Sequence, residues 1–275
     1  MEKYVLTGSF LELKSWNIEN ENKINCAFTE AKAHTSWIRC FSQVIQNTYV
    51  FTGGNKAINL WGIDNDGKLK LKHGNNAAHN GEIYCFSQVV GDNFIVSGSM
   101  KEMKIWNLAD LSKISLSKTI NSAHVDRVSA FCSSLEKNFI LSSSMNEIKL
   151  WDYSVKDGLT SICSKKDAIY GEITCLKSLP NKGFFVSGSF QEIKIWILIS
   201  HKLNNNVLSY YIEYVSVIEH AHTGAITGFS GISNDKKLLY SCGDDRKIKA
   251  WNIDDLNKAE FSHSMDCDYS LTAII

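Results

Sequence analysis

The sequence has 275 residues, and its apolar fraction of 44% is enough to fill the core of a globular protein. Its 29 basic and 29 acidic residues cancel, whereas proteins that bind nucleic acid usually carry a basic excess. No apolar run approaches the ~20 residues that a membrane-spanning helix needs. We therefore expect no nucleic-acid partner and no membrane association.

The first ten residues lack the basic and apolar regions of a secretory signal. The eight cysteines include no C-x-x-C pair, and disulfide frameworks belong mainly to oxidising compartments. These features favour a cytoplasmic protein.

A repeat runs along the chain. Before each of six tryptophans, a segment such as 4–9 or 184–189 is rich in β-branched and aromatic residues and ends in small ones, which indicates a strand entering a tight turn. A second strand of alternating apolar and polar residues then leads to the tryptophan. The first five tryptophans are 45 residues apart and the last gap is 55, at positions Trp16, Trp61, Trp106, Trp151, Trp196 and Trp251.

A further strand precedes most of these pairs, as at 38–41, 83–86 and 226–229, and its third residue is always small. Small residues suit the crowded innermost strand of a propeller. The first repeat lacks this strand, but residues 271–274 show its pattern at the other end of the chain. We therefore predict that the C-terminal strand joins the N-terminal blade and closes the ring, which leaves no open edge.

The repeats resemble those of the WD-repeat family over nearly the whole chain. The Trp-Asp or Trp-Asn pairs look like the family's Trp-Asp, and four Ala-His pairs look like its Gly-His, at His34, His79, His124 and His222. The resemblance and the strand count imply one all-β domain over residues 1–275. We predict a six-bladed β-propeller with four-stranded antiparallel blades centred on the six tryptophans.

The blade of Trp196 is followed by an insertion, residues 197–219, which is about ten residues longer than its counterparts. We interpret it as an extended outer hairpin with residues 204–206 at its tip. It is either a contact site that uses Tyr210 and Tyr211, or a solvated loop without a role.

The resemblance also implies a hydrogen-bonded set that holds each blade: a loop His, a hydroxyl, the Trp and a turn Asp. A buried Trp N–H and a buried hydroxyl need such partners. Four blades lack the turn Asp and carry a Glu close to its position: Glu12, Glu102, Glu147 and Glu192. This Glu either takes the place of the Asp, or it is solvated or paired with the following Lys. Only the last blade has the full set, which we predict to be structural rather than catalytic: His222, Ser241, Asp245 and Trp251.

The turns between the second and third strands hold four large apolar residues: Phe10, Met100, Met145 and Phe190. Loops on a rigid scaffold concentrate binding residues, and exposed apolar patches mark interaction sites. Trp37 lies outside the repeat phase and is a fifth candidate contact, because aromatic residues are enriched at binding hot spots. The alternative is that the turn side chains fold inward and pack between blades.

No phosphate-binding loop, zinc motif or calcium loop appears in the sequence. We therefore expect no catalytic residues, no metal and no cofactor, and no small-molecule ligand. The leading hypothesis is a non-enzymatic scaffold or adaptor that binds a protein or peptide on the loop face. One alternative is a constitutive structural subunit of a large assembly, contacting through the blade sides and the 197–219 insertion. Another is an enzyme or small-ligand propeller with its site in the central channel.

Overall fold

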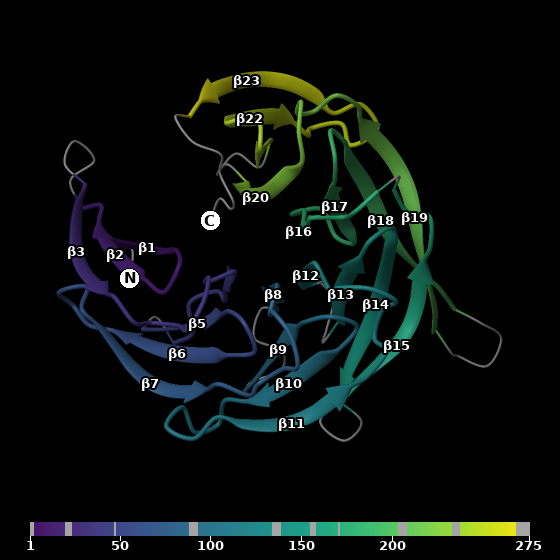
Figure 1. Ribbon diagram of the computed structural model, residues 1–275. Helices are drawn as coiled ribbons and strands as arrows, with labels where there is room; N and C mark the ends of the chain where they lie inside the picture. Colours follow the sequence, from purple (N-terminus) through teal and green to yellow (C-terminus); the bar gives the residue numbers. More distant parts are fainter. Residues whose placement is uncertain are drawn as a thin grey trace. The chain divides into compact units, whose positions relative to one another are not determined.

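The computed structural model is built entirely from β-strands and loops in the parts of the chain that it describes (Figure 1). These parts are residues 3–19, 24–46, 48–87, 93–133, 139–154, 158–169, 171–202, 208–232 and 237–267, with backbone alone at 230–232. Their strands form six antiparallel sheets. The chain divides into two compact units, unit 1 at residues 1–128 and unit 2 at residues 129–275.

Unit 1 contains the first three sheets. The first consists of β1 (Tyr4–Gly8), β2 (Leu13–Asn17) and β3 (Asn25–Glu30). The second consists of β4 (Cys40–Phe41), β5 (Tyr49–Gly53), β6 (Ile58–Ile63) and β7 (Leu69–Asn75). The third consists of β8 (Cys85–Phe86), β9 (Phe94–Gly98), β10 (Met103–Asn107) and β11 (Ser115–Ile120).

Unit 2 contains the other three. The fourth sheet consists of β12 (Ala130–Ser133), β13 (Phe139–Ser144), β14 (Glu147–Ser154) and β15 (Gly158–Lys165). The fifth consists of β16 (Cys175–Ser178), β17 (Phe184–Gly188), β18 (Ile193–Lys202) and β19 (Leu208–Ile218). The sixth consists of β20 (Ile226–Ile232), β21 (Leu238–Gly243), β22 (Lys247–Asn252) and β23 (Glu260–Asp266).

Each sheet is a meander in which sequence neighbours pair, which is the blade of a β-propeller. The predicted all-β fold of six antiparallel propeller blades is therefore confirmed. In every blade the pairing of the third and fourth strands shifts at the tryptophan, as between Ile105 and Trp106. Such a bulge bends and twists the outer strand, so the same residue that marks the repeat also marks its curvature.

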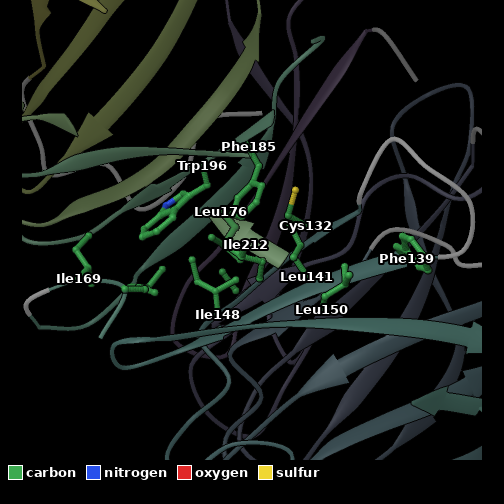
Figure 2. Packing of buried hydrophobic residues seen from close by; sticks show 13 residues of the cluster. Cys132, Phe139, Leu141, Ile148, Leu150, Ile169, Leu176, Phe185, Trp196 and Ile212 are labelled. Atoms are coloured by element: carbon green, nitrogen blue, oxygen red, sulfur yellow. The ribbon is translucent and has the colours of Figure 1, made fainter. Parts of the chain in front are cut away.

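The core lies between neighbouring sheets of each unit. Figure 2 shows one such cluster, in which Ile148 and Leu150 of the fourth sheet pack with Phe185, Trp196 and Ile212 of the fifth. All five side chains are at most 7% exposed. Burying a side chain of this size stabilises the fold by roughly 1.5–3 kcal/mol. The packing of these five side chains therefore holds the fourth blade against the fifth.

The small third residue of the inner strand has a steric cause. A Cβ placed on Gly188 would lie 2.6 Å from the Cys175 sulfur and 2.9 Å from an Ile226 methyl group. Cys85 faces Gly98 in the same way, so a larger inner residue would collide with the second strand. Burial raises the pKa of the Cys175 thiol to about 12, and such a thiol is inert packing material.

The predicted hairpin of the 197–219 insertion is present. β18 and β19 pair from Ile193 with Ile218 out to Lys202 with Leu208, while the predicted tip at 204–206 lies outside the described residues. One face packs on the fourth sheet, where the rings of Tyr210 and Phe139 lie 5.0 Å apart. Tyr211 remains half-exposed.

The first sheet has three strands in the described part of the chain. Residues 271–274, which the sequence assigns to its inner strand, lie outside the described residues. Ring closure by the C-terminal strand, and a single domain over residues 1–275, therefore stay predictions. Within the described segments no helix is long and apolar enough to span a membrane.

Candidate functional site

The turns between the second and third strands are pinned to the loop that follows the same sheet. Lys101 donates its N–H to the Asp126 carbonyl at 3.1 Å, and its own carbonyl accepts from the Ala123 N–H at 2.8 Å. Gln191 bonds to Gly224 and Ala221 in the same way. Both residues have positive φ, 61° and 67°, a conformation that L-residues rarely adopt. Two flanking backbone hydrogen bonds hold each turn in this conformation.

The residue before each pinned position projects into solvent. Phe10, Met100 and Phe190 form isolated bridges with the end of the loop that leads to the next inner strand, opposite Trp37, Arg127 and Ala225 respectively. Met145 occupies a tighter turn, in which Ser144 and Glu147 pair directly.

The five candidate contact residues are between 45% exposed, at Met145, and 60% exposed, at Phe190. The turn side chains thus do not fold inward. Phe10 and Trp37 lie together in unit 1, with ring centroids 5.6 Å apart in an edge-to-face arrangement. Met100 belongs to another turn of unit 1, and Met145 and Phe190 belong to unit 2.

Two further contacts in unit 1 link these positions. The Arg39 guanidinium pairs with the Glu82 carboxylate, with Nη2 and Oε1 3.1 Å apart. The guanidinium of Arg127 lies over the Tyr84 ring, 5.3 Å from its centroid. We call the following set the unit 1 turn surface: Phe10, Trp37, Arg39, Lys56, Glu82, Tyr84, Met100, Lys101 and Arg127.

The sequence reasoning missed Arg39, Glu82, Tyr84 and Arg127. They flank the buried residues Ile38, Ile83 and Val128 that begin the inner strands, and alternation along an extended chain turns them to the opposite side. Their size could have identified them in the sequence. The equivalent positions of unit 2 include small residues, namely Ser129, Thr174, Ala225 and Thr227.

An open pocket of about 570 Å³ lies beside Met100. Its walls come from the loop before β8, the turn before β10 and the loop after β11. They include Gly81, Glu82, Tyr84, Met100 and Lys101. Its mixed apolar and polar lining suits a side chain of a partner.

In the sixth sheet the predicted hydrogen-bonded set is assembled. His222 Nδ1 lies 2.7 Å from Asp245 Oδ1, and His222 Nε2 lies 2.7 Å from Ser241 Oγ. Trp251 Nε1 donates to Ser241 Oγ at 2.8 Å. Burial lowers the pKa of His222, although Asp245 opposes the shift. Burial would raise the pKa of Asp245, but hydrogen bonds from His222 and two backbone N–H groups lower it.

Comparison with known protein families identifies this same repeat. A family model described as WD domain, G-beta repeat, matches residues 213–252, which contain the complete set of the sixth sheet. The chain is a WD-repeat protein. No curated protein matches it. Propellers of WD repeats are generally protein-interaction scaffolds.

The other blades of this WD-repeat protein keep the Trp and the hydroxyl and vary the acid. In all six, the Trp Nε1 donates to the Ser or Thr hydroxyl at 2.7 to 2.9 Å. In the third sheet Glu102 replaces Asp, with its Oε1 2.7 Å from His79 Nδ1. In the second sheet Ala57 stands at this position, and the buried Nδ1 of His34 has no partner.

The remaining acids contact lysine. Glu12 lies 2.9 Å from Lys14, Glu147 3.4 Å from Lys149, and Glu192 3.9 Å from Lys194. Glu102 also lies 3.9 Å from Lys104, so it serves both partners. Glu12 and Glu192 belong to blades whose loops have no histidine at the position of His79, so neither can form the pair that Glu102 forms.

The His–Ser–Asp set of this WD-repeat protein is poorly placed for hydrolysis. Ser241 is 0% and His222 1% exposed, and the Ser241 hydroxyl already bonds to both His222 and Trp251. A nucleophile must reach a substrate carbonyl, which this hydroxyl does not. Within the described residues no group of three His, Cys, Asp or Glu side chains could hold a metal ion.

Proposed function

We propose that this WD-repeat protein is a non-enzymatic adaptor that binds a protein or peptide through its exposed turn residues. The observation that carries the proposal is the half-exposure of Phe10, Trp37, Met100, Met145 and Phe190 on turns and loops that backbone hydrogen bonds hold in place. Exposed apolar side chains in a rigid setting favour association, because little conformational freedom is lost on binding.

The same proposal includes a cytoplasmic setting and excludes nucleic acid, membrane and small molecules as partners. It is supported by the balanced charge of the chain and by the family's general role.

The test is affinity capture from a cell extract with quantitative mass spectrometry. Wild type is compared with a Phe10→Ser, Trp37→Ser, Met100→Ser variant and with a Met145→Ser, Phe190→Ser variant. A Leu71→Ser, Leu116→Ser variant is the matched control, since these residues of β7 and β11 are 49% and 48% exposed but lie on outer strands. Circular dichroism and thermal unfolding verify that each variant is folded.

We expect a specific set of proteins to be lost with at least one turn variant and retained with the control. Retention of the same proteins by both turn variants would refute the adaptor proposal. That result would favour the structural-subunit hypothesis, because Tyr211 and Tyr214 of the β18–β19 hairpin are 47% and 51% exposed and available for contact. A Tyr211→Ser, Tyr214→Ser variant would then be expected to lose the captured proteins.

A further inference from the structure

We propose that the unit 1 turn surface selects an extended acidic peptide that carries an apolar side chain. This inference rests on the proposed function and adds the chemistry of the partner. It is carried by the charges of this surface and by the pocket beside Met100.

The acidic groups of the surface are already engaged. Glu82 is paired with Arg39. Glu102, beneath the surface, bonds to His79 and lies near Lys104. Asp126 Oδ1 accepts the backbone N–H of Arg127 at 2.6 Å. A cationic partner would therefore compete with Arg39 for Glu82, and with His79 and Lys104 for Glu102.

The basic groups are in excess. Lys56 and Lys101 are exposed, and within the described part of the chain neither takes part in an ion pair. Lys101 lines the pocket, and the Lys56 N–H donates to the carbonyl of Gly81, which lines it too. Two cationic turns thus lie on the two sides of one loop. Charge complementarity of this kind selects partners and speeds encounter.

The apolar part of the partner has two places to bind. Met100 and Tyr84 line the pocket of about 570 Å³, and the flexible thioether of Met adapts to varied side chains. Phe10 and Trp37 provide a second apolar contact, and buried aromatic residues carry much of the binding energy at interfaces. Their arrangement on successive turns fits an extended chain.

The experiment uses the whole chain and three fluorescent pools of twelve-residue peptides. All pools share randomised aromatic and aliphatic positions. The remaining positions hold Asp and Glu in the acidic pool, Lys and Arg in the basic pool, and Ser and Asn in the neutral pool. Binding is followed by fluorescence anisotropy at low and moderate salt, and a labelled single-stranded oligonucleotide is measured alongside.

We expect the acidic pool to bind at least about tenfold more tightly than the basic pool, with a difference that shrinks as salt screens the charges. Lys56→Glu together with Lys101→Glu should abolish the preference. The matched control, Lys70→Glu with Lys72→Glu on β7, changes the net charge equally on an exposed outer strand and should leave it intact. Met100→Ser should weaken binding of the acidic pool.

Three results would overturn the inference. Equal binding of all pools, weakened by Met100→Ser, would refute the acidic partner and leave the adaptor proposal standing. Unchanged peptide binding by the Phe10→Ser, Trp37→Ser, Met100→Ser triple variant would place the peptide site elsewhere. This result would count against both the acidic-peptide inference and the adaptor proposal. Preference for the oligonucleotide, lost in the Lys56→Glu, Lys101→Glu variant, would assign the surface to nucleic acid instead.

Discussion

The second and third sheets contain the same hydrogen-bonded unit and differ at one acid. His34 Nε2 lies 2.6 Å from Thr52 Oγ1, and His79 Nε2 lies 2.6 Å from Ser97 Oγ. Beyond this, His79 Nδ1 bonds to Glu102, whereas the buried Nδ1 of His34 has no hydrogen-bond partner, and Ala57 stands at the position of Glu102 in the repeat. The contact among histidine, hydroxyl and tryptophan therefore forms without the acid.

The lysine position changes together with the acid. Lys104 donates to the Ala78 carbonyl at 2.7 Å and lies 3.9 Å from Glu102. In the second sheet the neutral amide of Asn59 makes the equivalent bond to Ala33 at 2.7 Å. The second sheet thus lacks both the buried acid and the buried cation, and this position carries no charged pair. A buried charge without its partner would be costly.

The largest expected effect is on the sheet that has the acid. Glu102→Ala should lower the free energy of unfolding by about 2–3 kcal/mol, because it leaves the buried His79 Nδ1 without an acceptor and Lys104 without its carboxylate neighbour. Urea unfolding measures this change. Glu12→Ala is the control and should cost less than about 0.5 kcal/mol, since the Glu12 side chain is 40% exposed and its pair with Lys14 lies at the surface. Equal losses in the two variants would contradict a special role for Glu102.

A smaller effect concerns pH and His34. Burial lowers the pKa of His34 from 6.5 to about 4, so between these values the unfolded chain binds a proton that the folded chain does not. The stabilisation is complete above pH 6.5 and is lost as pH falls toward 4, by roughly 2 kcal/mol between pH 7 and pH 5. Urea unfolding of wild type and His34→Gln at several pH values tests this. An unchanged slope in the variant would show that His34 does not titrate as described.

The smallest expected effect is an increase in the stability of the second sheet. Ala57→Glu with Asn59→Lys would give the second sheet the acid and lysine of the third. We expect roughly 1 kcal/mol of added stability, because the buried Nδ1 of His34 gains a partner. Thermal unfolding of the double variant and of Ala57→Glu alone measures the gain, and the single variant should gain less because its carboxylate lacks a lysine. A loss in the double variant would mean that the site has no room for the larger side chains.

The unit 1 turn surface shows the limits of sequence reasoning in another way. Its apolar turn positions could be predicted because they recur at a fixed place in each repeat. The ion pair of Arg39 with Glu82 joins residues 43 positions apart, and the guanidinium of Arg127 lies over the ring of Tyr84, which belongs to another loop of unit 1. No local pattern predicts such contacts, since they depend on how one blade packs against the next.

The sequence by itself determined the strands, the turns and the number of blades. Alternation, turn chemistry and the position of the tryptophan act within a few residues, so they can be recognised in one repeat and verified in the next five. It also identified the complete hydrogen-bonded set of the sixth sheet, where all four residue types are present.

Only the tertiary structure decided what the individual side chains do. It placed Glu102 within 2.7 Å of His79 and 3.9 Å of Lys104, whereas the sequence left open which of these partners the acid contacts. It left the turn residues exposed and joined Phe10 to Trp37. The physical reason is that burial and partner choice depend on atoms from neighbouring loops and sheets, and each repeat meets different neighbours even where its own pattern is the same.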